Sequence, residues 1–500
     1  MPESVLLALD QGTTSTRAMV FARDGKVLAL ASRPLAQSYP ADGWVEHDAV
    51  AIFQASVEVM REAVQACGQP LANFAALGIT NQRETTVVWD KESGKPIHAA
   101  IVWQDRRTAD FCDVLRDEGV EGEVAETTGL LLDPYFSATK IAWILDRVDG
   151  AREAAGQGKL LAGTIDAWLV WKLTGGAVHA TDATNASRTL LLDIRSGQWS
   201  EPMADLFGAP LSLMPEVRDT AGDYGQVSAD ILGAPLPIRG LVGDQQGALM
   251  GQGCIASGQM KATFGTGCFM LLHTGDRLHI SGSRLLSTVA SRVAGKTAYA
   301  LEGSLFVAGA AIEWAQQVLG VQGGPKAVEA LAKTARPDHG VILVPAFTGL
   351  GAPWWDANAR GALLGLTRDS GPAEISAAAY EGCALQTRDL IEAMRKDAPE
   401  AFAKDAPLKI DGGMASSPFF RQCLADLTGV AAQPSLNPEA TALGAALYAG
   451  IGAGVYASQA DAIASLASDG GDIVKPALAN EKREAAYERW LDAIGRVRSH

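Results

Sequence analysis

Several common signatures are missing from this 500-residue sequence. It contains neither GxxxxGK followed by Ser or Thr nor GxGxxG, so it predicts neither a Walker A loop nor a Rossmann dinucleotide site. Its six cysteines form no CxxC pair, which argues against a zinc site or a disulfide framework and fits a reducing cytoplasm. No apolar run is long enough to cross a bilayer, and the first, Val5–Leu9, is too short for a signal peptide.

An excess of positive charge is also missing. Lys and Arg number 42 against 57 Asp and Glu, which gives a net charge of −15 at pH 7. Such a surface repels nucleic acid and anionic lipid, so neither nucleic acid nor membrane insertion is expected. An anionic substrate would need a local positive site made of backbone N–H groups, Mg²⁺ or a few arginines. The length predicts at least two domains.

Turn residues between apolar runs predict that three antiparallel strands open the chain. A helix and a further strand are expected after them. The expected elements are the strands Val5–Leu9, Arg17–Ala22 and Lys26–Ala31, the helix Ile52–Gln65 and the strand Ala76–Thr80.

A fainter version of this opening returns later in the chain. Gln259–Phe264 is strand-like, Gly265–Gly267 is a turn, and Cys268–His273 returns as a strand. This repetition predicts two related halves that join near residues 245–260.

Three elements are suited to binding phosphate. In the first, Gly12 permits a tight turn, and the hydroxyls and N–H groups of Thr13, Thr14 and Ser15 can surround phosphate oxygens. Asp10, at the strand end, could hold Mg²⁺ through water. An ordinary Thr-rich hairpin turn would look the same.

The other two elements lie in the second half. Phe264–Cys268 carries a Thr between two glycines, and Leu408–Gly413 is a strand that ends in Gly-Gly before the expected helix Phe419–Leu427. Such segments can present N–H groups to an anion, or be a plain hairpin and a plain strand–helix link. Three of them in one chain favour a divided ATP site.

These elements belong to a longer series of motifs: LALDQGTTSTRA, GWVEHD, GITNQRETTVVWD, AIVWQDRRT, DPYFSATK, TDATNASRT, GDQQGAL, FGTGCFM, VPAFTGLGAPWWD, RGALLGLTR and DGGMASS. From about residue 5 to about residue 455 the chain closely resembles the glycerol kinases of the FGGY carbohydrate kinase family. GWVEHD, TNQRET and TNASRT are specific to glycerol kinases, whereas the Gly-Thr turns occur across the wider superfamily.

The resemblance implies an α/β fold with two RNase H-like domains, as in actin, hexokinase and the Hsp70 ATPase, that flank a deep cleft. The domains would be residues 1–250, with the glycerol site and the first phosphate hairpin, and residues 251–500, with the second hairpin and the adenine site. It also implies ATP-dependent phosphorylation of glycerol, with ATP and Mg²⁺ as cofactors, in a cytoplasmic homo-oligomer (dimer or tetramer).

The resemblance also implies site residues. The glycerol site would consist of Arg83, Glu84, Trp103, Tyr135, Asp244, Gln245 and Phe269, in which Trp103 and Phe269 form the apolar wall. The ATP site would consist of Thr13, Thr14, Ser15, Arg17, Thr266, Gly309, Glu313, Gly413 and Ser417, with Asp10 near Mg²⁺.

The chemistry of a small polyol suits these residues. Arg83 supplies fixed donors and Glu84 supplies acceptors, and both can face one ligand only from a loop, because neighbours in a strand point to opposite faces. Asp244 follows the apolar segment Ile238–Gly243 and can accept the proton of the attacking hydroxyl as a general base. It could equally be a turn residue that caps the expected helix Gln245–Gly251.

Two positions depart from most relatives at the purine end. Ser417 stands where most have Asn, and Glu313 stands where bacterial relatives often have Gln. We expect Ser417→Asn to lower KM for ATP. The Gly- and Arg-bearing loop of relatives inhibited by fructose 1,6-bisphosphate is absent from Ser228–Pro237, so that inhibition is not expected.

Two other functions fit parts of the sequence. Another FGGY kinase that acts on a ketopentose or polyol would share the phosphate turns. An actin-like or chaperone-like ATPase module would share the two halves, but it would not need the polar set of Arg83, Glu84 and Asp244.

Overall fold

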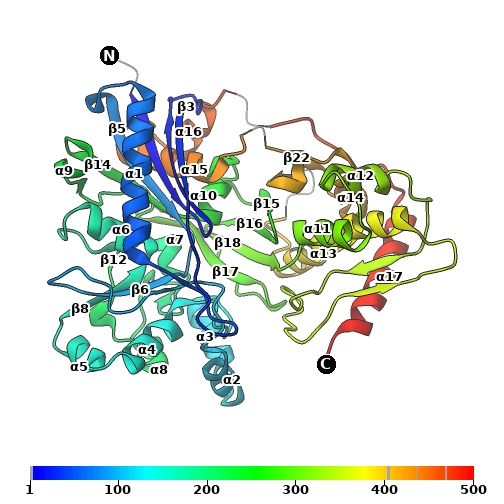
Figure 1. Cartoon of the computed structure of the whole chain (residues 1–500), viewed down its shortest axis with the longest axis horizontal. Coiled ribbons are helices and arrows are strands. Elements are labelled where there is room, and N and C mark those ends of the chain that lie inside the picture. The colour runs from blue at the N-terminus through cyan, green and yellow to red at the C-terminus, as the bar shows by residue number, and fades with distance from the viewer. Residues whose placement is uncertain (1–3, 403–405, 436, 468–469, 500) are drawn as a thin grey trace.

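The computed structural model describes residues 4–402, 406–435, 437–467 and 470–499. Two six-stranded sheets organise the chain, one in each half (Figure 1). The first sheet has the order β13-β14-β5-β1-β2-β3, with the strands β1 (Val5–Gln11), β2 (Ser15–Phe21), β3 (Val27–Pro34), β5 (Phe74–Asn81), β13 (Gln226–Val227) and β14 (Leu236–Gly243). The second has the order β17-β18-β16-β15-β21-β22, with β15 (Met260–Phe264), β16 (Cys268–Gly275), β17 (Leu286–Val293), β18 (Lys296–Leu305), β21 (Leu408–Asp411) and β22 (Ala432–Pro434).

The two sheets share one topology. In the first, β1 is antiparallel to β2 and parallel to β5, which in turn is parallel to β14. In the second, β15 is antiparallel to β16 and parallel to β21, which is parallel to β22. The repeated hairpin in the sequence therefore marks a repeated fold, and the predicted α/β architecture with two related halves is confirmed.

The first hairpin forms because its strands are apolar on both faces and its turn is not. All seven residues of β1 are buried, as parallel and central strands require. The helix α1 (Ala49–Cys67) covers this sheet; Asp48 caps its start by accepting from Val50 N and Ala51 N, and Gly68 ends it in the left-handed conformation. The expected strands and helix are therefore confirmed, with ends shifted by at most three residues.

A third sheet extends the first half. Its order is β4-β7-β6-β8, with β4 (Glu46–His47), β6 (Thr86–Asp90), β7 (Ala100–Ile101) and β8 (Leu160–Thr164). The short pairs are β10 (Leu192–Asp193) with β11 (Gln198–Trp199), β9 (Ala180–Asp182) with β12 (Glu216–Arg218), and β19 (Ile342–Val344) with β20 (Ala362–Leu364).

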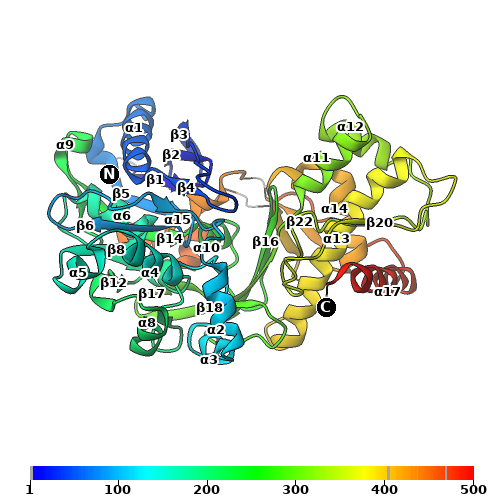
Figure 2. The same ribbon diagram turned by 60° about the horizontal axis from the view of Figure 1, so that its bottom comes forward.

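The remaining helices pack around these sheets (Figures 1 and 2). In the first half they are α2 (Ala109–Asp117), α3 (Glu121–Thr128), α4 (Ser137–Arg147), α5 (Ala151–Gly156), α6 (Ile165–Leu173), α7 (Ala183–Ala186), α8 (Glu201–Phe207), α9 (Ala229–Leu232) and α10 (Asp244–Gly251). Beyond it they are α11 (Gly309–Val318), α12 (Pro325–Ala332), α13 (Pro372–Asp397), α14 (Pro418–Thr428), α15 (Ala440–Gly452), α16 (Gln459–Ala464) and α17 (Asn480–Val497). The described helices include none with the length and apolarity to span a bilayer.

One late helix returns to the first half. Figure 1 shows α15 beside α10 and the first sheet, far from α17. α15 packs on β1, β5 and β14, and it approaches α10 so closely that a Cβ on Gly444 would lie 1.9 Å from the carbonyl oxygen of Gly247. Only glycine fits at this crossing. A helix from the second half of the sequence thus packs against the first sheet. The division of the two domains at residue 250 stays a prediction.

One strand of the second sheet, β17, is also fixed to the first half. The hydroxyls of Ser187 and Thr288 lie 3.1 Å apart, and Arg292 pairs with Asp219 at 2.8 Å. These contacts hold β17 against the first half, so side chains on the adjacent strand β18 can reach a site built by residues from both halves.

Candidate functional site

The β1–β2 hairpin places its polar turn at the edge of the first sheet. Gly12 N donates to Ser15 O at 2.9 Å, which leaves Thr13 and Thr14 at the tip. Asp10 is buried opposite Arg17, and their side chains pair at 2.5 Å. Burial raises the pKa of Asp10, while Arg17 opposes the rise. The turn is therefore short and polar, with a buried carboxylate at its base.

Arg17 also reaches the late part of the chain. Its second guanidinium nitrogen pairs with Glu439 at 2.6 Å, directly before α15. Arg17 keeps about a third of its side chain exposed, so it can still meet an anion beside the turn. Sequence reasoning did not single out Glu439, because more than 400 residues separate it from its partner.

The second hairpin carries the Gly265–Gly267 turn between β15 and β16. The start of α11 packs onto this turn: Gly309 N donates to Gly265 O at 2.9 Å, and Ala308 N donates to Thr266 O at 2.8 Å. The structure therefore brings Thr266 and Gly309 together, as the predicted ATP site requires. Glu313 lies one turn further along α11 and is exposed.

The Gly-Gly segment after β21 lies against the same hairpin. Gly412 has φ +86°, and a Cβ there would lie 2.3 Å from Phe264 O, so only glycine fits. Gly413 has open space where a Cβ would lie. The three phosphate-suited elements are thus real turns at strand ends, and the second and third are adjacent.

Ser417 has a structural task of its own. It is buried, and its Oγ accepts from Phe420 N at 3.1 Å, which caps α14. It also hydrogen-bonds to Glu329 and helps to lower the pKa of that carboxyl. The cap was not foreseen, and contact of Ser417 with a nucleotide stays a prediction.

The change Ser417→Asn separates these two roles. Asn and Ser are both favoured N-cap residues, so the melting temperature should stay within experimental error. If position 417 faces the nucleotide, the larger amide should lower KM for ATP about two- to tenfold, the equivalent of one hydrogen bond, with kcat unchanged. Steady-state kinetics with ATP varied measures this effect. An unaltered KM in a stable variant would leave Ser417 as a cap only.

Arg83 and Glu84 lie between β5 and β6, outside both strands, as predicted. Glu84 has φ +61°, a left-handed conformation that turns its side chain to the same region as that of Arg83. The Arg83 Nε lies 3.2 Å from an oxygen of Asp244. The three charged residues of the predicted glycerol site, Arg83, Glu84 and Asp244, therefore converge.

Asp244 is the first residue of α10, and Gly243 is its N-cap. The helix thus begins one residue earlier than the sequence suggested, and the alternative in which Asp244 is its N-cap is wrong. Its Oδ1 accepts from Gln245 N at 2.7 Å, and its side chain is 31% exposed. Burial raises the pKa of Asp244, opposed by Arg83 and Lys261, and a raised pKa makes its carboxylate a better proton acceptor.

Three aromatic rings stand beside this polar group. The Trp103 ring centroid lies 5.5 Å from that of Tyr135 and 6.1 Å from that of Phe269. The Trp103 Nε1 donates to Thr13 Oγ1 at 3.0 Å. The aromatic wall predicted for glycerol is therefore joined directly to the first phosphate-suited turn.

Sequence reasoning missed two charged residues that pair with Arg83 and Glu84. They are Glu302 on β18 and Arg188 after α7. Glu302 accepts from both terminal nitrogens of Arg83, at 2.6 and 2.9 Å, and Arg188 reaches Glu302 at 3.1 Å and Glu84 at 2.7 Å. All four side chains are at least 98% buried. Arg188 lay in the TNASRT motif, whereas Glu302 gave only the signal of a charge within an apolar strand.

A buried lysine, Lys261 on β15, was also missed. Its Nζ donates to Gln245 Oε1 and, at 3.0 Å, to Thr263 Oγ1. Its side chain is fully buried, and burial lowers its pKa, while Asp411, Asp244 and Glu302 oppose this. Gln245 therefore ties the second hairpin to the Asp244 helix through its side-chain oxygen, and its contact with glycerol stays a prediction.

Asp10 is the carboxylate predicted to lie near a metal ion. Nowhere in the described ranges do three His, Cys, Asp or Glu side chains form a metal cluster. Mg²⁺ commonly takes one or two carboxylates and completes its shell with water and substrate phosphates. The buried Asp10 carboxylate beside the hairpin turn fits that mode, because the nearby charge of Asp244 also raises its pKa and a cation would relieve both effects.

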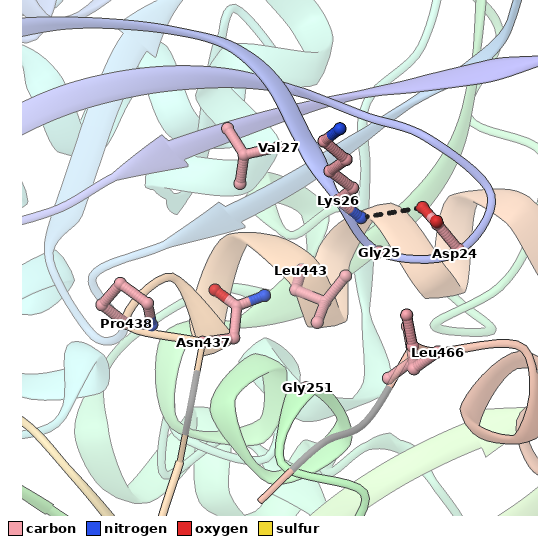
Figure 3. A pocket seen from close by; sticks show the side chains of 10 residues that line it. Asp24, Gly25, Lys26, Val27, Gly251, Asn437, Pro438, Leu443 and Leu466 are labelled. Atoms are coloured by element: carbon pink, nitrogen blue, oxygen red, sulfur yellow. Dashed lines mark hydrogen bonds between the residues drawn. The ribbon is translucent and has the colours of Figure 1, made fainter.

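A separate cavity of about 390 Å³ lies elsewhere (Figure 3). The β2–β3 turn, the end of α10 and the start of α15 form it, and Gly25, Lys26, Leu443 and Leu466 are among its lining residues. No predicted site residue lines it, so the candidate site is assigned from the contacts above and not from this cavity.

Comparison with known proteins agrees with this geometry. Residues 5–251 match the N-terminal domain of the FGGY family of carbohydrate kinases, and residues 260–453 match its C-terminal domain. Proteins called glycerol kinase from Alteromonas mediterranea and Ectopseudomonas mendocina are 50% and 51% identical to the chain over 494 residues, 99% of each chain. The crystal structure of Plasmodium falciparum glycerol kinase with ADP has a TM-score of 0.92 at 30% identity and covers 99% of this chain and 98% of that one.

Proposed function

The chain belongs to the FGGY family of carbohydrate kinases, and we propose that it transfers the γ-phosphoryl group of ATP to a terminal hydroxyl of glycerol, giving sn-glycerol 3-phosphate. One observation carries the assignment of the site. Trp103 contacts Thr13 of the phosphate turn on one side and Tyr135, which stands beside the charged residues of the site, on the other. A small polyol in this wall would have its hydroxyl next to the phosphate turn.

The residues divide the work of binding. Arg83 and Glu84 would bind two glycerol hydroxyls, because a guanidinium only donates and a carboxylate accepts. Trp103, Tyr135 and Phe269 would cover the carbon chain. A ligand that lacked a hydroxyl would leave one of these buried polar groups unpaired, which is the main source of selectivity.

The reaction would proceed by in-line transfer. Asp244 would accept the proton of the attacking hydroxyl as general base, with Arg83 holding its carboxylate in place. Thr13, Thr14, Ser15 and Thr266 would bind the phosphates through hydroxyl and N–H groups, and Arg17 would offset their charge. Gly309, Glu313, Gly413 and Ser417 would lie toward the nucleoside.

Mg²⁺ would be held beside Asp10 and would neutralise charge on the β- and γ-phosphates when bound. We further propose a cytoplasmic homo-oligomer, a dimer or tetramer, with neither nucleic acid nor membrane as a partner. The acidic net charge of −15 supports the last point.

A coupled assay tests the function. ATP turnover is measured without acceptor and with glycerol, xylulose or ribulose at equal concentration. We expect turnover to depend on glycerol, with a kcat/KM at least tenfold above that for either ketose. Equal or greater turnover with a ketose would assign the chain to another kinase of the family. Turnover without any acceptor would favour an ATPase module.

We also expect the two halves to approach one another on binding. The proposed ligands Thr13, Arg83 and Tyr135 come from the first half, and Thr266 and Gly413 come from the second. Closure would exclude water and so limit hydrolysis of ATP. Small-angle scattering should show a smaller radius of gyration with glycerol and a non-hydrolysable ATP analogue than with either alone. A superimposable curve in all states would contradict closure.

A further inference from the structure

The motif DPYFSATK contains a lysine to which the proposed reaction gives no task. Lys140 lies in the first turn of α4, and its side chain is fully buried. A lone buried ammonium is costly unless it is paired or hydrogen-bonded. Here its Nζ donates to three consecutive backbone carbonyls, those of Pro134 at 2.7 Å, Tyr135 at 2.6 Å and Phe136 at 3.2 Å.

These carbonyls belong to the turn that carries Tyr135 into the substrate site. An ammonium has three donors, and all three are used on this turn. Tyr135 N is held in addition by Asp133 Oδ1 at 2.9 Å, and the hydroxyl of Ser137 donates to Glu84 O at 2.9 Å. Lys140 thus holds the carbonyls of the turn, and Ser137 joins the turn to the loop that carries Glu84.

We infer that Lys140 is a positioning residue for the acceptor substrate: its ammonium gathers the carbonyls of Pro134, Tyr135 and Phe136 so that the Tyr135 ring stands against Trp103 and covers the glycerol. This inference rests on the glycerol site proposed above. Lys140 itself touches backbone only, so its effect on catalysis passes through Tyr135 and, by the Ser137 contact, through Glu84.

The charge of Lys140 adds a dependence on pH. Burial lowers the pKa of Lys140 to about 8, although Glu84, Asp105, Asp133 and the Cys112 thiol face it and oppose the change. Asp133 is itself paired with Arg106 at 2.7 Å. Above that pH a neutral amine forms, which has two donors instead of three, and one carbonyl of the turn loses its partner. Affinity for the acceptor should therefore fall as the pH rises past about 8, while affinity for ATP should not.

The experiment compares the full-length variants Lys140→Met, Lys140→Gln, Tyr135→Ala and the double variant Lys140→Met with Tyr135→Ala. Lys172→Met serves as the matched control, because Lys172 is a partly buried lysine of α6 that lies over Phe53, outside the site. KM for glycerol, KM for ATP, kcat and the melting temperature are measured for each. Wild type and Tyr135→Ala, which lacks the ring, are also assayed from about pH 7 to about pH 9.5.

We expect Lys140→Met to lower kcat/KM for glycerol by roughly 10- to 10²-fold, the effect of a misplacement of about 1 Å, with KM for ATP within about twofold of wild type. Lys140→Gln should fall between Met and wild type, and Lys172→Met should match wild type. The effects of Lys140→Met and Tyr135→Ala should be strongly non-additive, since both act on the contact made by the Tyr135 ring. In wild type, KM for glycerol should rise above about pH 8, and in Tyr135→Ala it should not.

The possible outcomes separate the two proposals. If Tyr135→Ala alone leaves KM for glycerol unchanged, the proposed substrate site is wrong. If Tyr135→Ala raises it but Lys140→Met changes both KM values equally, or adds independently to Tyr135→Ala, the inference is overturned and the site stands. Should the Lys140 variants not fold, the wild-type pH series decides: a KM for glycerol that stays level through pH 9 contradicts the inference.

Discussion

Asp244→Asn should lower kcat by roughly 10²- to 10⁴-fold, the range for loss of a general base, and leave the protein folded. The amide oxygen can still accept from Gln245 N, and Arg83 keeps its two bonds to Glu302. Glycerol should therefore still bind, while the hydroxyl proton has no acceptor. Turnover is measured in the coupled assay, and glycerol binding is measured by calorimetry with an ATP analogue present.

The pH profile provides a second readout for Asp244. Burial raises its pKa, so the acid limb of the wild-type kcat profile should lie above the ordinary range for Asp, since the carboxyl must be ionised to accept a proton. That limb should be absent from the residual activity of Asp244→Asn. Asp223→Asn is the control, because Asp223 is an exposed residue that pairs with Arg239 at the surface. Near-normal kcat in Asp244→Asn would remove Asp244 from the mechanism.

The parts of the fold that were predicted from sequence depend on local chemistry. The first hairpin follows from an apolar run, a Gly-Thr turn and a second apolar run, all within the residues of β1 and β2. The break that places Arg83 and Glu84 in a loop is equally local. Strand ends moved because pairing with neighbours extends them: β5 begins at Phe74, where β1 supplies a partner for it.

The parts that were missed depend on contacts between distant segments. Glu302 and Arg83 are 219 positions apart, and nothing in the local pattern of β18 says which arginine its carboxylate meets. Arg17 and Glu439 are 422 apart. The return of α15 to the first sheet is also non-local. Gly444 is required because α15 crosses α10 at Gly247, and neither glycine alone indicates in the sequence that the two helices cross there. Motif resemblance reached the residues that we propose to face the ligand and left unassigned the charged residues that pair with them.

Glu302→Gln should be the most destabilising single change in the site. Glu302 is fully buried and offsets two buried arginines, Arg83 and Arg188. Removing one partner of a buried ion pair leaves uncompensated charge and typically costs about 3–5 kcal/mol of unfolding free energy. The glutamine amide can accept one hydrogen bond but brings an NH₂ group toward the guanidinium of Arg83. The Arg83 side chain should then no longer be held in its position in the glycerol site, so KM for glycerol should rise as well.

Equilibrium unfolding in urea measures the loss of stability, with Glu392→Gln as control because Glu392 forms partly exposed pairs on α13 that are worth little. The pKa of Glu302 determines in which direction the stability should change with pH. Burial alone would raise the pKa of Glu302, but Arg188 and Arg83 hold it down to about 2 against an ordinary value of 4.5. A lowered pKa contributes stability that is complete above about pH 4.5 and is lost as the pH falls toward about 2.

The difference in stability between wild type and Glu302→Gln should therefore be constant from about pH 7 to about pH 5 and shrink at about pH 3.5. Wild type falls toward the variant over that interval, because its carboxylate begins to take up a proton in the unfolded chain before it does so in the folded one. If the difference in unfolding free energy between wild type and Glu302→Gln stays fixed down to about pH 3.5, Glu302 stabilises the fold through its shape rather than through its charge. Equal stability of wild type and Glu302→Gln at about pH 7 would show that Arg83 and Arg188 find other partners. It would also show that the position of the Arg83 side chain does not depend on Glu302.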